Sequence, residues 1–381
     1  MKTTETVYLS LGSNLGDKLN NLQNAVFLIQ KRAGNITRIS PVYETPAWGF
    51  EGGDFLNACL ALEAKFAPEK LMDILLDIET KLGRKRTIEE GYQPRTIDID
   101  LLFYGNEIVR SEHLTVPHPY LQQRKFVLKP LSDIAPQFYH PVLGRDLRNL
   151  LQECGDDSVL TKTKFKLYTH RKQLFSTLQF MAIEGNIGAG KTTLASKIAA
   201  DFNAKLILER FADNPFLPKF YEDQSRYAFP LEMSFLADRY QQFTDDTSQF
   251  DLFKKFMISD YDIYKSLIFA KVTLQVDEFA LYRKVFDFMY KEVKKPDVYV
   301  FLYQNSERLL ENIKKRGRDY ERNISPDYLE KINNGYMEFI KGRPVGNSVI
   351  IELEGLDFVE SRNDYETVLA KIQNFIVNLT L

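Results

Sequence analysis

The sequence predicts two α/β domains joined by a short linker. The chain has 381 residues, which exceeds the length at which a single hydrophobic core stops growing. Segments with strand-like and helix-like spacing alternate from the first residues onward. A glycine-rich loop of a kind that normally follows the first strand of a domain lies near mid-chain, at residues 185–193. We therefore place one domain at residues 1–156, a linker at 157–178 and a second domain at 179–381.

The central loop follows the pattern Gly185-x-x-x-x-Gly190-Lys191-Thr192. An apolar run at residues 180–183 predicts a buried strand before the loop, and apolar residues at helical spacing follow it. The backbone N–H groups of such a loop face phosphate oxygens at a helix N-terminus. We expect Lys191 to bridge the outer phosphates and Thr192 to hold Mg²⁺. The predicted phosphate-contacting residues are Gly185, Asn186, Ile187, Gly188, Ala189, Gly190, Lys191, Thr192 and Thr193.

Composition and charge argue against several classes of protein. Lys plus Arg number 50 and Asp plus Glu number 52, a net charge of −2, which disfavours general binding to nucleic acid or membrane surfaces. Cys59 and Cys154 are the two cysteines, and they lack the spacing of metal ligands or of a disulfide framework. The first residues have no apolar signal core, and no apolar run reaches the roughly 18 residues that span a membrane. We expect a cytoplasmic protein that acts on small molecules.

The first half alternates strands and helices. Residues 7–11 read as a strand that ends in a turn at 12–17 with the residues of a helix N-cap. We expect a helix to about residue 31, strands over 36–43 and 55–64, and a helix over 68–82 with proline in its first turn. Residues 45–54 are too rich in proline and glycine for regular structure. This alternation predicts an α/β sandwich.

Candidate chemistry in the first half concentrates at residues 79–104. Asp98 and Asp100 point to one face of a predicted strand, while the residues between and beside them are apolar. Adjacent carboxylates repel unless a cation lies between them, so Mg²⁺ with nucleotide phosphates is one explanation. A solvated polar strand face is the other. The nearby side chains that favour phosphate chemistry are Arg84, Arg86, Arg95, His118 and Arg124.

Ordered motifs over residues 5–155 resemble one known family. They are Gly12-Ser13-Asn14, Thr45-Pro46, Phe55-x-Asn57, Glu79-x-x-x-Gly83-Arg84-x-Arg86, Pro94-Arg95-Thr96-Ile97-Asp98-Ile99-Asp100, and His118-Pro119 through Arg124-x-Phe126. Together they resemble 6-hydroxymethyl-7,8-dihydropterin pyrophosphokinase. The resemblance implies a ferredoxin-like α+β sandwich. It also implies transfer of a diphosphate from ATP to the pterin hydroxymethyl oxygen, a step of folate synthesis that leaves AMP.

The same resemblance implies site residues. Two Mg²⁺ ions would bind at Asp98 and Asp100, which would act with Arg84 and Arg95 as the catalytic set. The implied ATP and phosphate contacts further include Glu79, Arg86, His118 and Arg124. The implied pterin contacts are Asn14, Thr45, Pro46, Phe55, Asn57 and Phe126. The loops around residues 49–50 and 84–86 are the implied lids.

The join between the domains is polar. Residues 157–178 carry several lysines and arginines and lack clear periodicity until Leu174. We interpret them as a solvated linker that ends in a short helix.

The second half predicts a five-stranded parallel sheet flanked by helices. Strands are expected at residues 180–183, 204–208, 256–259, 298–303 and 349–353, with helices after the phosphate loop, over 228–243 and over 363–379. Glu209 follows the second strand, where functional carboxylates lie in open parallel sheets. It is a candidate base for a substrate hydroxyl, or else it pairs with Arg210. Three arginines within residues 316–322 indicate either a solvated face or a lid over a transferring phosphoryl group.

Motifs over residues 179–381 resemble the deoxynucleoside kinases, and among them the bacterial deoxyguanosine/deoxyadenosine kinase branch. They are Gly185-Asn-Ile-Gly-Ala-Gly-Lys-Thr192, Asp213-Asn-Pro-Phe-Leu217, Leu231-Glu232-Met233, Asp260-Tyr-Asp-Ile-Tyr-Lys265 and Arg316-Gly-Arg-Asp-Tyr-Glu321. The resemblance implies a P-loop kinase fold and ATP-dependent 5′-phosphorylation of a deoxynucleoside. It also implies a homodimer formed through this domain.

This second resemblance also implies residue roles. Glu209 would be the base, Tyr221 and Glu321 would hold the sugar 3′-hydroxyl, and Glu232 and Arg239 would read the nucleobase. Asp260 would line the nucleoside site. The implied lid is formed by Arg316, Arg318 and Arg322, and the implied border of the adenine of ATP by Asp357 and Phe358.

Two positions depart from the family pattern. Asp260-Tyr261-Asp262 stands where many relatives carry an acidic residue followed by Arg and Ser, so a cation that would steer phosphates there is missing unless a lid arginine replaces it. Glu232 stands where many relatives carry Gln. A carboxylate accepts hydrogen bonds, and guanine offers N1–H and N2–H₂ as donors. We therefore expect deoxyguanosine to be preferred over deoxyadenosine.

The sequence thus predicts a bifunctional transferase that uses Mg²⁺ and ATP at two independent sites. One alternative keeps only the pyrophosphokinase active and makes the P-loop domain a nucleotide-binding or scaffold module. A second alternative is a nucleotide sensor without turnover.

Overall fold

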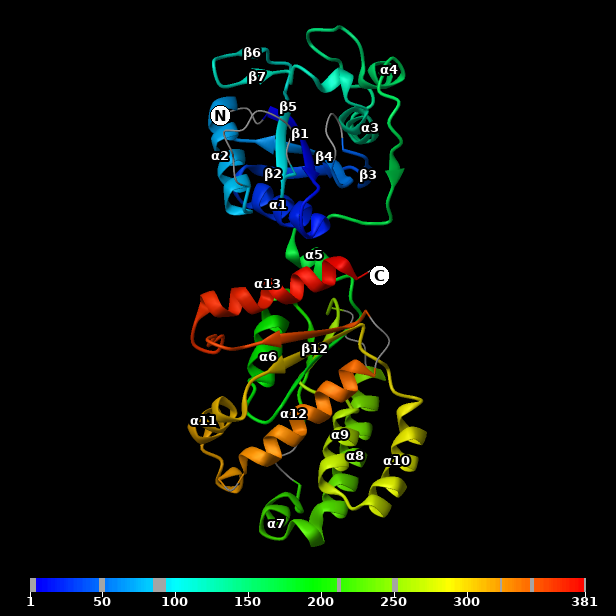
Figure 1. The fold of residues 1–381 in the computed structure, drawn as a ribbon, viewed down its shortest axis with the longest axis vertical. Coiled ribbons are helices and arrows are strands. Elements are labelled where there is room, and N and C mark those ends of the chain that lie inside the picture. Colours follow the sequence, from blue (N-terminus) through cyan, green and yellow to red (C-terminus); the bar gives the residue numbers. More distant parts are fainter. Residues whose placement is uncertain are drawn as a thin grey trace. The chain divides into compact units, whose positions relative to one another are not determined.

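The computed structural model describes residues 5–47, 52–84, 94–210, 214–248, 253–322, 324–342 and 346–379. The chain divides into two compact units between Gln173 and Leu174. Each unit has a main sheet of its own (Figure 1). No helix in these described ranges is long and apolar enough to cross a membrane.

The first unit is built on a six-stranded sheet of antiparallel pairs. Its strands are β1 (Glu5–Ser13), β2 (Gly34–Ile39), β3 (Tyr43–Thr45), β4 (Phe55–Ala64), β5 (Asp98–Tyr104) and β8 (Thr161–Lys162). The order is β5-β1-β4-β3-β8, and β2 also pairs with β4. With α1 (Lys18–Arg32) and α2 (Pro68–Lys81), the chain runs β1-α1-β2-β3-β4-α2-β5, which is the β-α-β-β-α-β order of a ferredoxin-like sandwich with one added short strand, β3. The predicted fold class of this half is confirmed.

The sheet of the first unit is covered by helices. α3 (Lys125–Ile134) and α4 (Leu147–Gln152) pack on the face that carries Tyr8, Cys59 and Phe103. Helices α1 and α2 contact each other, and they contact β1 and β5 respectively. A small hairpin of β6 (Val109–Arg110) and β7 (Thr115–Val116) and a 3-10 turn, η1 (Leu121–Gln123), precede α3.

The register of the sheet gathers polar residues on one face. Gly12 of β1 pairs with Asp98 of β5 and with Asn57 of β4, and Ser10 pairs with Asp100. Because side chains alternate between the faces of a strand, these five residues share the face on which α3 packs. The antiparallel register therefore builds a polar floor from three strands distant in sequence.

Two differences from the sequence prediction have local causes. The predicted strand over residues 36–43 is two strands, because Pro41 lies between β2 and β3 and has no N–H to donate to a ladder. The segment predicted as a linker contains a strand that the sequence did not indicate: β8 pairs with β3 through Lys162 and Tyr43. The predicted short helix is α5 (Arg171–Phe175).

The second unit has a five-stranded parallel sheet, as predicted. Its strands are β9 (Phe180–Gly185), β10 (Lys205–Ile207), β11 (Met257–Ser259), β12 (Val298–Tyr303) and β13 (Ser348–Glu352), in the order β10-β11-β9-β12-β13. The phosphate loop follows β9, Glu209 follows β10 and Asp260 follows β11. All three therefore lie at the carboxyl edge of the sheet, where open parallel sheets bind ligands.

Helices flank this sheet (Figure 1). They are α6 (Lys191–Phe202), α7 (Leu217–Glu222), α8 (Gln224–Ser248), α9 (Lys265–Thr273), α10 (Val276–Tyr290), α11 (Ser306–Arg316), α12 (Pro326–Lys341) and α13 (Arg362–Asn378), with a 3-10 turn η2 (Asp319–Glu321). Much of the core is aromatic: Phe180, Tyr299 and Phe301 of the sheet pack with Tyr336 of α12. The helices predicted at residues 228–243 and 363–379 are confirmed as α8 and α13.

The start of β2 generates a stability prediction. A Cβ at Gly34 would lie 2.2 Å from the backbone oxygen of Glu63 in β4. Gly34→Ala must therefore separate two paired strands, and we expect it to lower the free energy of unfolding of the first unit by about 1–3 kcal/mol. Urea unfolding followed by the fluorescence of Trp48, the single tryptophan of the chain, measures this.

The matched control is Gly155→Ala in the same unit, where a Cβ would meet nothing within 4 Å. Equal unfolding midpoints for the two variants would contradict the argument.

Candidate active sites

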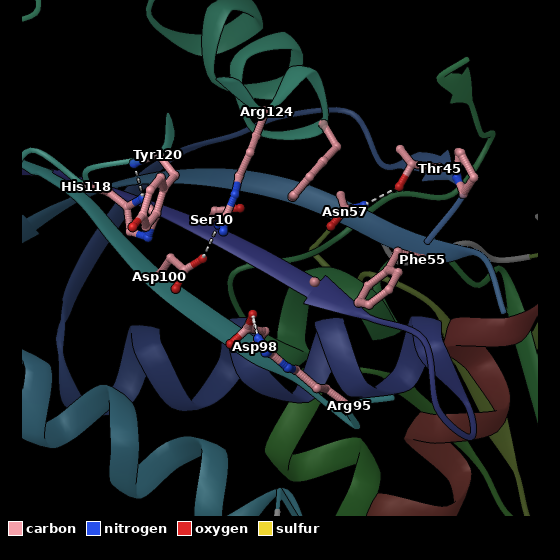
Figure 2. A pocket seen from close by; sticks show the side chains of 13 residues that line it. Ser10, Thr45, Phe55, Asn57, Arg95, Asp98, Asp100, His118, Tyr120 and Arg124 are labelled. Carbon is pink, nitrogen blue, oxygen red and sulfur yellow. Dashed lines mark hydrogen bonds and ion pairs between the residues drawn. The ribbon is translucent and has the colours of Figure 1, made fainter. Parts of the chain in front are cut away.

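The first unit contains a cavity of about 260 Å³ above the polar face of its sheet (Figure 2). Strands β1, β4 and β5 supply its floor, and the segment from His118 to the start of α3 supplies a wall. The lining residues are Ser10, Gly12, Thr45, Pro46, Phe55, Asn57, Arg95, Asp98, Asp100, His118, Tyr120, Arg124 and Phe126.

The two aspartates predicted from the sequence both line this cavity. Arg84 Nη1 lies 2.5 Å from Asp98 Oδ1, and Arg95 forms an ion pair with the other carboxylate oxygen of Asp98. Arg124 Nη1 lies 3.9 Å from Asp100 Oδ2. Burial and the negative charge of Asp98 raise the pKa of Asp100 to about 7. The pair is thus one carboxylate held by two arginines beside one that is weakly compensated.

Glu79 supports this arrangement from outside the cavity lining. Its side chain is buried, accepts a hydrogen bond of 2.8 Å from the backbone N–H of Ile99, and pairs with Arg84. The guanidinium of Arg84 is therefore shared between Glu79 and Asp98. Neither Glu79 nor Arg84 is among the residues that line the cavity. Glu79 therefore orients the guanidinium of Arg84, and Arg84 in turn orients the carboxylate of Asp98.

His118 lines the cavity as a neutral imidazole. Its Nδ1 accepts a hydrogen bond of 3.3 Å from the backbone N–H of Tyr120. Burial and the positive charge of Arg124 lower the pKa of His118 to about 4. At neutral pH the Nε2–H is therefore a hydrogen-bond donor without a net charge. Tyr120, which the sequence did not single out, is 54% exposed at the rim of this cavity.

The other end of the cavity suits a flat, polar ring. Phe55 and Phe126 line it, and the guanidinium of Arg124 lies 5.9 Å from the centre of the Phe126 ring. Asn57 Nδ2 donates a hydrogen bond of 2.7 Å to Thr45 Oγ1, which orients the amide. A Cβ at Gly12 would come within 2.9 Å of Asn57 Oδ1, so glycine leaves room for that amide. Pro46 is also in the lining.

Asn14 has a different place from the other predicted pterin contacts. It does not line the cavity. Its Oδ1 accepts a hydrogen bond of 2.7 Å from the backbone N–H of Arg95, and its own N–H donates to Arg95 O at 3.1 Å. Asn14 therefore holds the segment that carries Arg95. The structure does not describe residues 48–51 and 85–93. Arg86 and most of the two predicted lids, around residues 49–50 and 84–86, therefore lie outside the described residues.

The aspartate pair fits Mg²⁺ bound together with a nucleotide. No group of three or more His, Cys, Asp or Glu side chains suited to a metal occurs in the described parts of the chain. Mg²⁺ is usually held by one or two carboxylates with the remaining positions filled by phosphate oxygens and water. Asp98 and Asp100 supply that number on one face of β5. The donor set therefore matches a metal that arrives with phosphates.

The second unit contains a cavity of about 130 Å³ at the carboxyl edge of its sheet. It brings together side chains that are up to 141 positions apart in the sequence, from Ile187 to Tyr328. The predicted residues that line it are Ile187, Lys191, Thr192, Glu209, Tyr221, Glu232, Arg239, Asp260, Arg316, Arg318 and Glu321.

The phosphate loop has the predicted form between β9 and α6. Gly188 and Gly190 have φ angles of 83° and 87°, a region that favours glycine. Lys191 Nζ donates to the backbone oxygen of Asn186 at 2.9 Å, so the ammonium folds back over the loop. Asn186 in turn donates to Leu329 O at 2.7 Å, which braces the loop against α12. The backbone from Gly185 to Thr193 is thus shaped for phosphate oxygens.

Thr192 and Asp260 form a second place that suits Mg²⁺. The Thr192 hydroxyl donates to Asp260 Oδ2 at 2.5 Å, and Asp260 Oδ1 accepts from the backbone N–H of Glu209 at 2.8 Å. One hydroxyl and one carboxylate oxygen beside a phosphate loop match the small number of protein ligands that Mg²⁺ takes in nucleotide sites.

Glu209 is held by two buried cations. Arg239 approaches Oε1 with Nη2 at 2.7 Å and Nε at 2.8 Å, and Lys265 Nζ lies 2.7 Å from Oε2. Burial alone would raise the pKa of Glu209, but Lys265 and Arg239 hold it well below its usual value. The neighbouring Arg210, an alternative partner in the sequence prediction, is not the residue that Glu209 contacts in these ion pairs.

Glu232 lines the same cavity, and one of its two carboxylate oxygens has a hydrogen-bond partner. Its Oε1 accepts a hydrogen bond of 3.0 Å from Thr273 Oγ1. Its Oε2 is buried, and no described residue is its hydrogen-bond partner. Burial raises the pKa of Glu232 to about 7. An unsatisfied buried acceptor in a cavity is a strong reason to expect a ligand donor there.

The predicted arginine lid divides into two parts. Arg316 and Arg318 line the cavity, and both pair with Glu321. Arg316 Nη2 lies 2.5 Å from Glu321 Oε2, and Arg318 Nη1 lies 3.4 Å from Glu321 Oε1. Arg322 instead pairs with Asp319, and its side chain is 75% exposed. Glu321 therefore gathers two of the three lid arginines at the cavity.

A larger cavity of about 480 Å³ lies on the other side of the phosphate loop. Its lining includes Gly188, Ala189, Gly190, Thr193, Asp357 and Phe358. A Cβ at Gly190 would come within 2.6 Å of the Phe358 ring. The segment at residues 357–358 thus packs directly on the loop, where the sequence placed the adenine of ATP.

Two polar residues that line the cavity of about 130 Å³ were not assigned a role from the sequence. Lys265 stands in the quoted motif after Asp260, but a single lysine at the start of a helix carries no recognisable signal. Tyr328 lines the cavity from α12 and is remote in sequence from every predicted motif. Only the packing of α9 and α12 against the site reveals them.

Comparison with known proteins matches each unit separately. A family model described as deoxynucleoside kinase matches residues 181–377, and one described as 7,8-dihydro-6-hydroxymethylpterin-pyrophosphokinase matches residues 8–136.

Individual relatives follow the same division. The chain is 36% identical over 206 residues to a deoxyguanosine kinase of Bacillus subtilis (strain 168), which covers 53% of this chain and 100% of the relative. It is 40% identical over 149 residues to a 2-amino-4-hydroxy-6-hydroxymethyldihydropteridine pyrophosphokinase of Aquifex aeolicus (strain VF5), covering 39% and 91%. A solved structure of deoxyadenosine kinase from M. mycoides with bound dATP aligns at 24% identity with a TM-score of 0.45, covering 51% of this chain and 98% of that one.

The boundary between the two structural units, at residues 173 and 174, falls between the ranges that the two family models match. The chain therefore belongs to two families: its first unit is a 7,8-dihydro-6-hydroxymethylpterin pyrophosphokinase domain, and its second unit is a deoxynucleoside kinase domain.

Proposed function

We propose that this chain is a bifunctional enzyme. Its first domain, residues 1–156, transfers a diphosphate from ATP to 6-hydroxymethyl-7,8-dihydropterin and releases AMP. Its second domain, residues 179–381, transfers the γ-phosphoryl group of ATP to the 5′-hydroxyl of a purine deoxynucleoside. The observation that carries the proposal is that each unit has its own cavity with its own set of cations and carboxylates for phosphate. Membership of two families that use ATP, typically with Mg²⁺, supports it.

In the first site, binding and charge neutralisation account for the chemistry. Phe55 and Phe126 would hold the pterin ring, with the Asn57 amide and the Thr45 hydroxyl at its polar edge. The hydroxymethyl oxygen loses its proton to water as it forms a bond to the β-phosphorus of ATP. The bond from that phosphorus to the α,β-bridging oxygen breaks, and AMP leaves. Mg²⁺ supplies charge neutralisation and alignment of the phosphates when bound.

The protein side chains of the first site would act around that transfer. Asp98 and Asp100 would hold the metal, and the arginines that now pair with them would turn to phosphate oxygens, where planar guanidinium groups bind well. The cationic contacts are Arg84, Arg95 and Arg124, with Arg86 in a segment outside the described residues. The neutral His118 would donate a hydrogen bond to a phosphate oxygen.

In the second site, Lys191 and the backbone of residues 185–193 would hold the phosphates of ATP, and Asp357 and Phe358 would border its adenine. Thr192 would take part in binding Mg²⁺. Glu209 would accept the proton of the 5′-hydroxyl as that oxygen bonds to the γ-phosphorus and ADP leaves. Arg316 and Arg318 would stabilise the charge on the transferring group. Tyr221 and Glu321 would hold the sugar 3′-hydroxyl.

Glu232 favours guanine as the nucleobase. Glu232 lines the cavity and its Oε2 has no hydrogen-bond partner among the described residues, while guanine presents adjacent N1–H and N2–H₂ donors whose hydrogen bonds a carboxylate can accept. Adenine presents an acceptor at N1, which would repel the charged carboxylate. Arg239 lies against the Phe235 ring, with 4.7 Å between its guanidinium carbon and the ring centre, and would contact an acceptor on the same base. The B. subtilis relative is a deoxyguanosine kinase, which supports this preference.

We further propose a cytoplasmic homodimer that forms through the second domain. Helix α10 exposes large apolar side chains that soluble monomers seldom leave in water together: Val276 is 84% exposed, Leu281 55% and Phe288 78%. Leu281 and Phe288 lie seven residues apart on one face of the helix.

The independence of the two sites gives the main test. Asp98→Asn is expected to lower the rate of AMP release with the hydroxymethyl pterin by about 100-fold or more, and to leave deoxynucleoside phosphorylation unchanged. Lys191→Met should do the reverse, because it removes only the phosphate-loop cation. Both rates are measured on the full chain with ATP and one acceptor at a time.

Matched exposed positions serve as controls: Asp73→Asn in the first unit and Lys271→Met in the second should change neither rate. Release of AMP without any ADP would mean that the P-loop domain is a scaffold. Release of neither would mean a sensor without turnover.

The nucleobase assignment makes a prediction with pH. Glu232→Gln removes one acceptor and adds a donor, so kcat/KM for deoxyguanosine should fall by about 10- to 100-fold relative to deoxyadenosine. The raised pKa of about 7 means that the carboxylate is charged above pH 7 and protonated below it. For wild type, kcat/KM for deoxyguanosine should therefore fall as pH drops through 7.

For the Glu232→Gln variant, kcat/KM for deoxyguanosine should not show this fall at low pH when it is measured from about pH 5.5 to about pH 8.5. Faster phosphorylation of thymidine than of either purine deoxynucleoside by the wild type would show that the nucleobase assignment is wrong.

The dimer proposal is tested at the exposed end of α10. Phe288→Asp places a charge on the apolar face and should shift the protein from dimer to monomer in analytical ultracentrifugation. Phe253→Asp is the matched control, since Phe253 is 85% exposed but lies off this helix. A wild-type protein that sediments as a monomer at micromolar concentration would refute the dimer.

A further inference from the structure

Lys265 is a buried cation of the second site to which neither the sequence nor the family match assigns a role. It is the first residue of α9, its exposed fraction is 7%, and it lines the same cavity as Lys191, Thr192 and Arg316. Its ammonium lies 2.7 Å from Oε2 of Glu209. A buried lysine is costly unless it serves a partner, so its place beside the candidate base requires an explanation.

The backbone ahead of Lys265 is fixed to the strand that carries the phosphate loop. The backbone N–H of Asp262 donates to Glu184 Oε1 at 2.6 Å, and Glu184 is the fully buried residue just before Gly185. Asp262 then accepts twice: Oδ1 from the N–H of Tyr264 at 2.7 Å, and its backbone oxygen from the N–H of Lys265 at 3.0 Å. The start of α9 is therefore positioned directly relative to the loop.

The charges around Lys265 suit an incoming phosphate. Lys265 and Lys191 face one cavity, and burial together with the charge of Lys265 lowers the pKa of Lys191 to about 8. Two ammonium groups that repel each other in the free protein are both stabilised by an added polyanion. The carboxylates near them, Glu184, Glu209 and Asp260, are already bonded to protein groups.

The two cations on Glu209 differ in their freedom to move. Arg239 makes two bonds to Oε1 of Glu209, and its Nη1 donates to Ser266 Oγ at 2.7 Å. Lys265 approaches Oε2 with a single atom at the end of a flexible four-carbon chain. Arg239 is thus the fixed partner, and Lys265 is the one that can change partner without disturbing the carboxylate.

We propose that Lys265 is a further catalytic residue of the kinase site, whose ammonium pairs with Glu209 in the free protein and contacts an oxygen of the transferring phosphoryl group in the complex. The proposal rests on the proposed kinase function. As the 5′-oxygen bonds to the γ-phosphorus and ADP leaves, the hydroxyl proton passes to Oε2 of Glu209, which Lys265 has vacated. Lys265 thereby supplies the cation that the Asp260-Tyr261-Asp262 sequence lacks, from five positions beyond Asp260.

A double-mutant cycle with Glu209 tests the contact. Lys265→Met is expected to lower kcat for deoxyguanosine by about 100-fold, while Lys271→Met, at an exposed position of the same helix, leaves it unchanged. In a Glu209→Gln background, Lys265→Met should lower the residual rate again by about 10-fold or more, because the phosphoryl contact does not depend on the base. The cycle is repeated with Lys265→Gln, which keeps a polar group at this position. The result then does not depend on whether the Met variant folds.

No further loss in the Glu209→Gln background would overturn the proposal, since Lys265 would then act only by holding Glu209. A wild-type protein that phosphorylates none of the four deoxynucleosides would instead refute the proposed function. Measured AMP release by the first domain in the same preparation distinguishes that result from an inactive sample.

Discussion

A carboxylate clamped between two cations, partly buried in the first unit and buried in the second, is the interaction on which both sites depend. Asp98 lies between Arg84 and Arg95 in the first unit, and Glu209 lies between Arg239 and Lys265 in the second. A charge removed from water is tolerated only when a partner compensates it at close range. The clamp orients each carboxylate, and in the second unit the two cations also hold the pKa of Glu209 well below its usual value. It also places two cations where the phosphates of ATP would have to bind.

The two units reach this arrangement through different folds. In the antiparallel sheet of the first unit, the pairing of β1 with β4 and β5 turns residues from three strands toward one face. In the parallel sheet of the second unit, the residues that follow β9, β10 and β11 meet at one edge because all strands run in the same direction. The common feature is thus the electrostatic solution, and the fold determines only which segments contribute to it.

Much of the fold and part of the sites could be predicted from the sequence, and the failures have physical causes. The phosphate loop and the Asp98–Asp100 pair are local patterns whose geometry follows from a strand and a turn. Strand β8 has no such pattern, because two residues that pair with an edge strand need no hydrophobic period. The partner of Glu209 also escaped prediction: proximity in sequence suggested Arg210, while the packing of α8 and α9 brings Arg239 and Lys265 to the carboxylate.

The sequence by itself determined the two-domain organisation, the class of each fold and the phosphate-handling motifs, because these depend on periodicity and on residues close together in the chain. Only the tertiary structure decided which polar and charged groups meet. Asn14 turned out to hold the segment of Arg95, Glu321 to gather Arg316 and Arg318, and Lys265 to reach Glu209. Such contacts join residues whose separation in sequence carries no information, since side-chain reach and the register of packed elements set the distances between them.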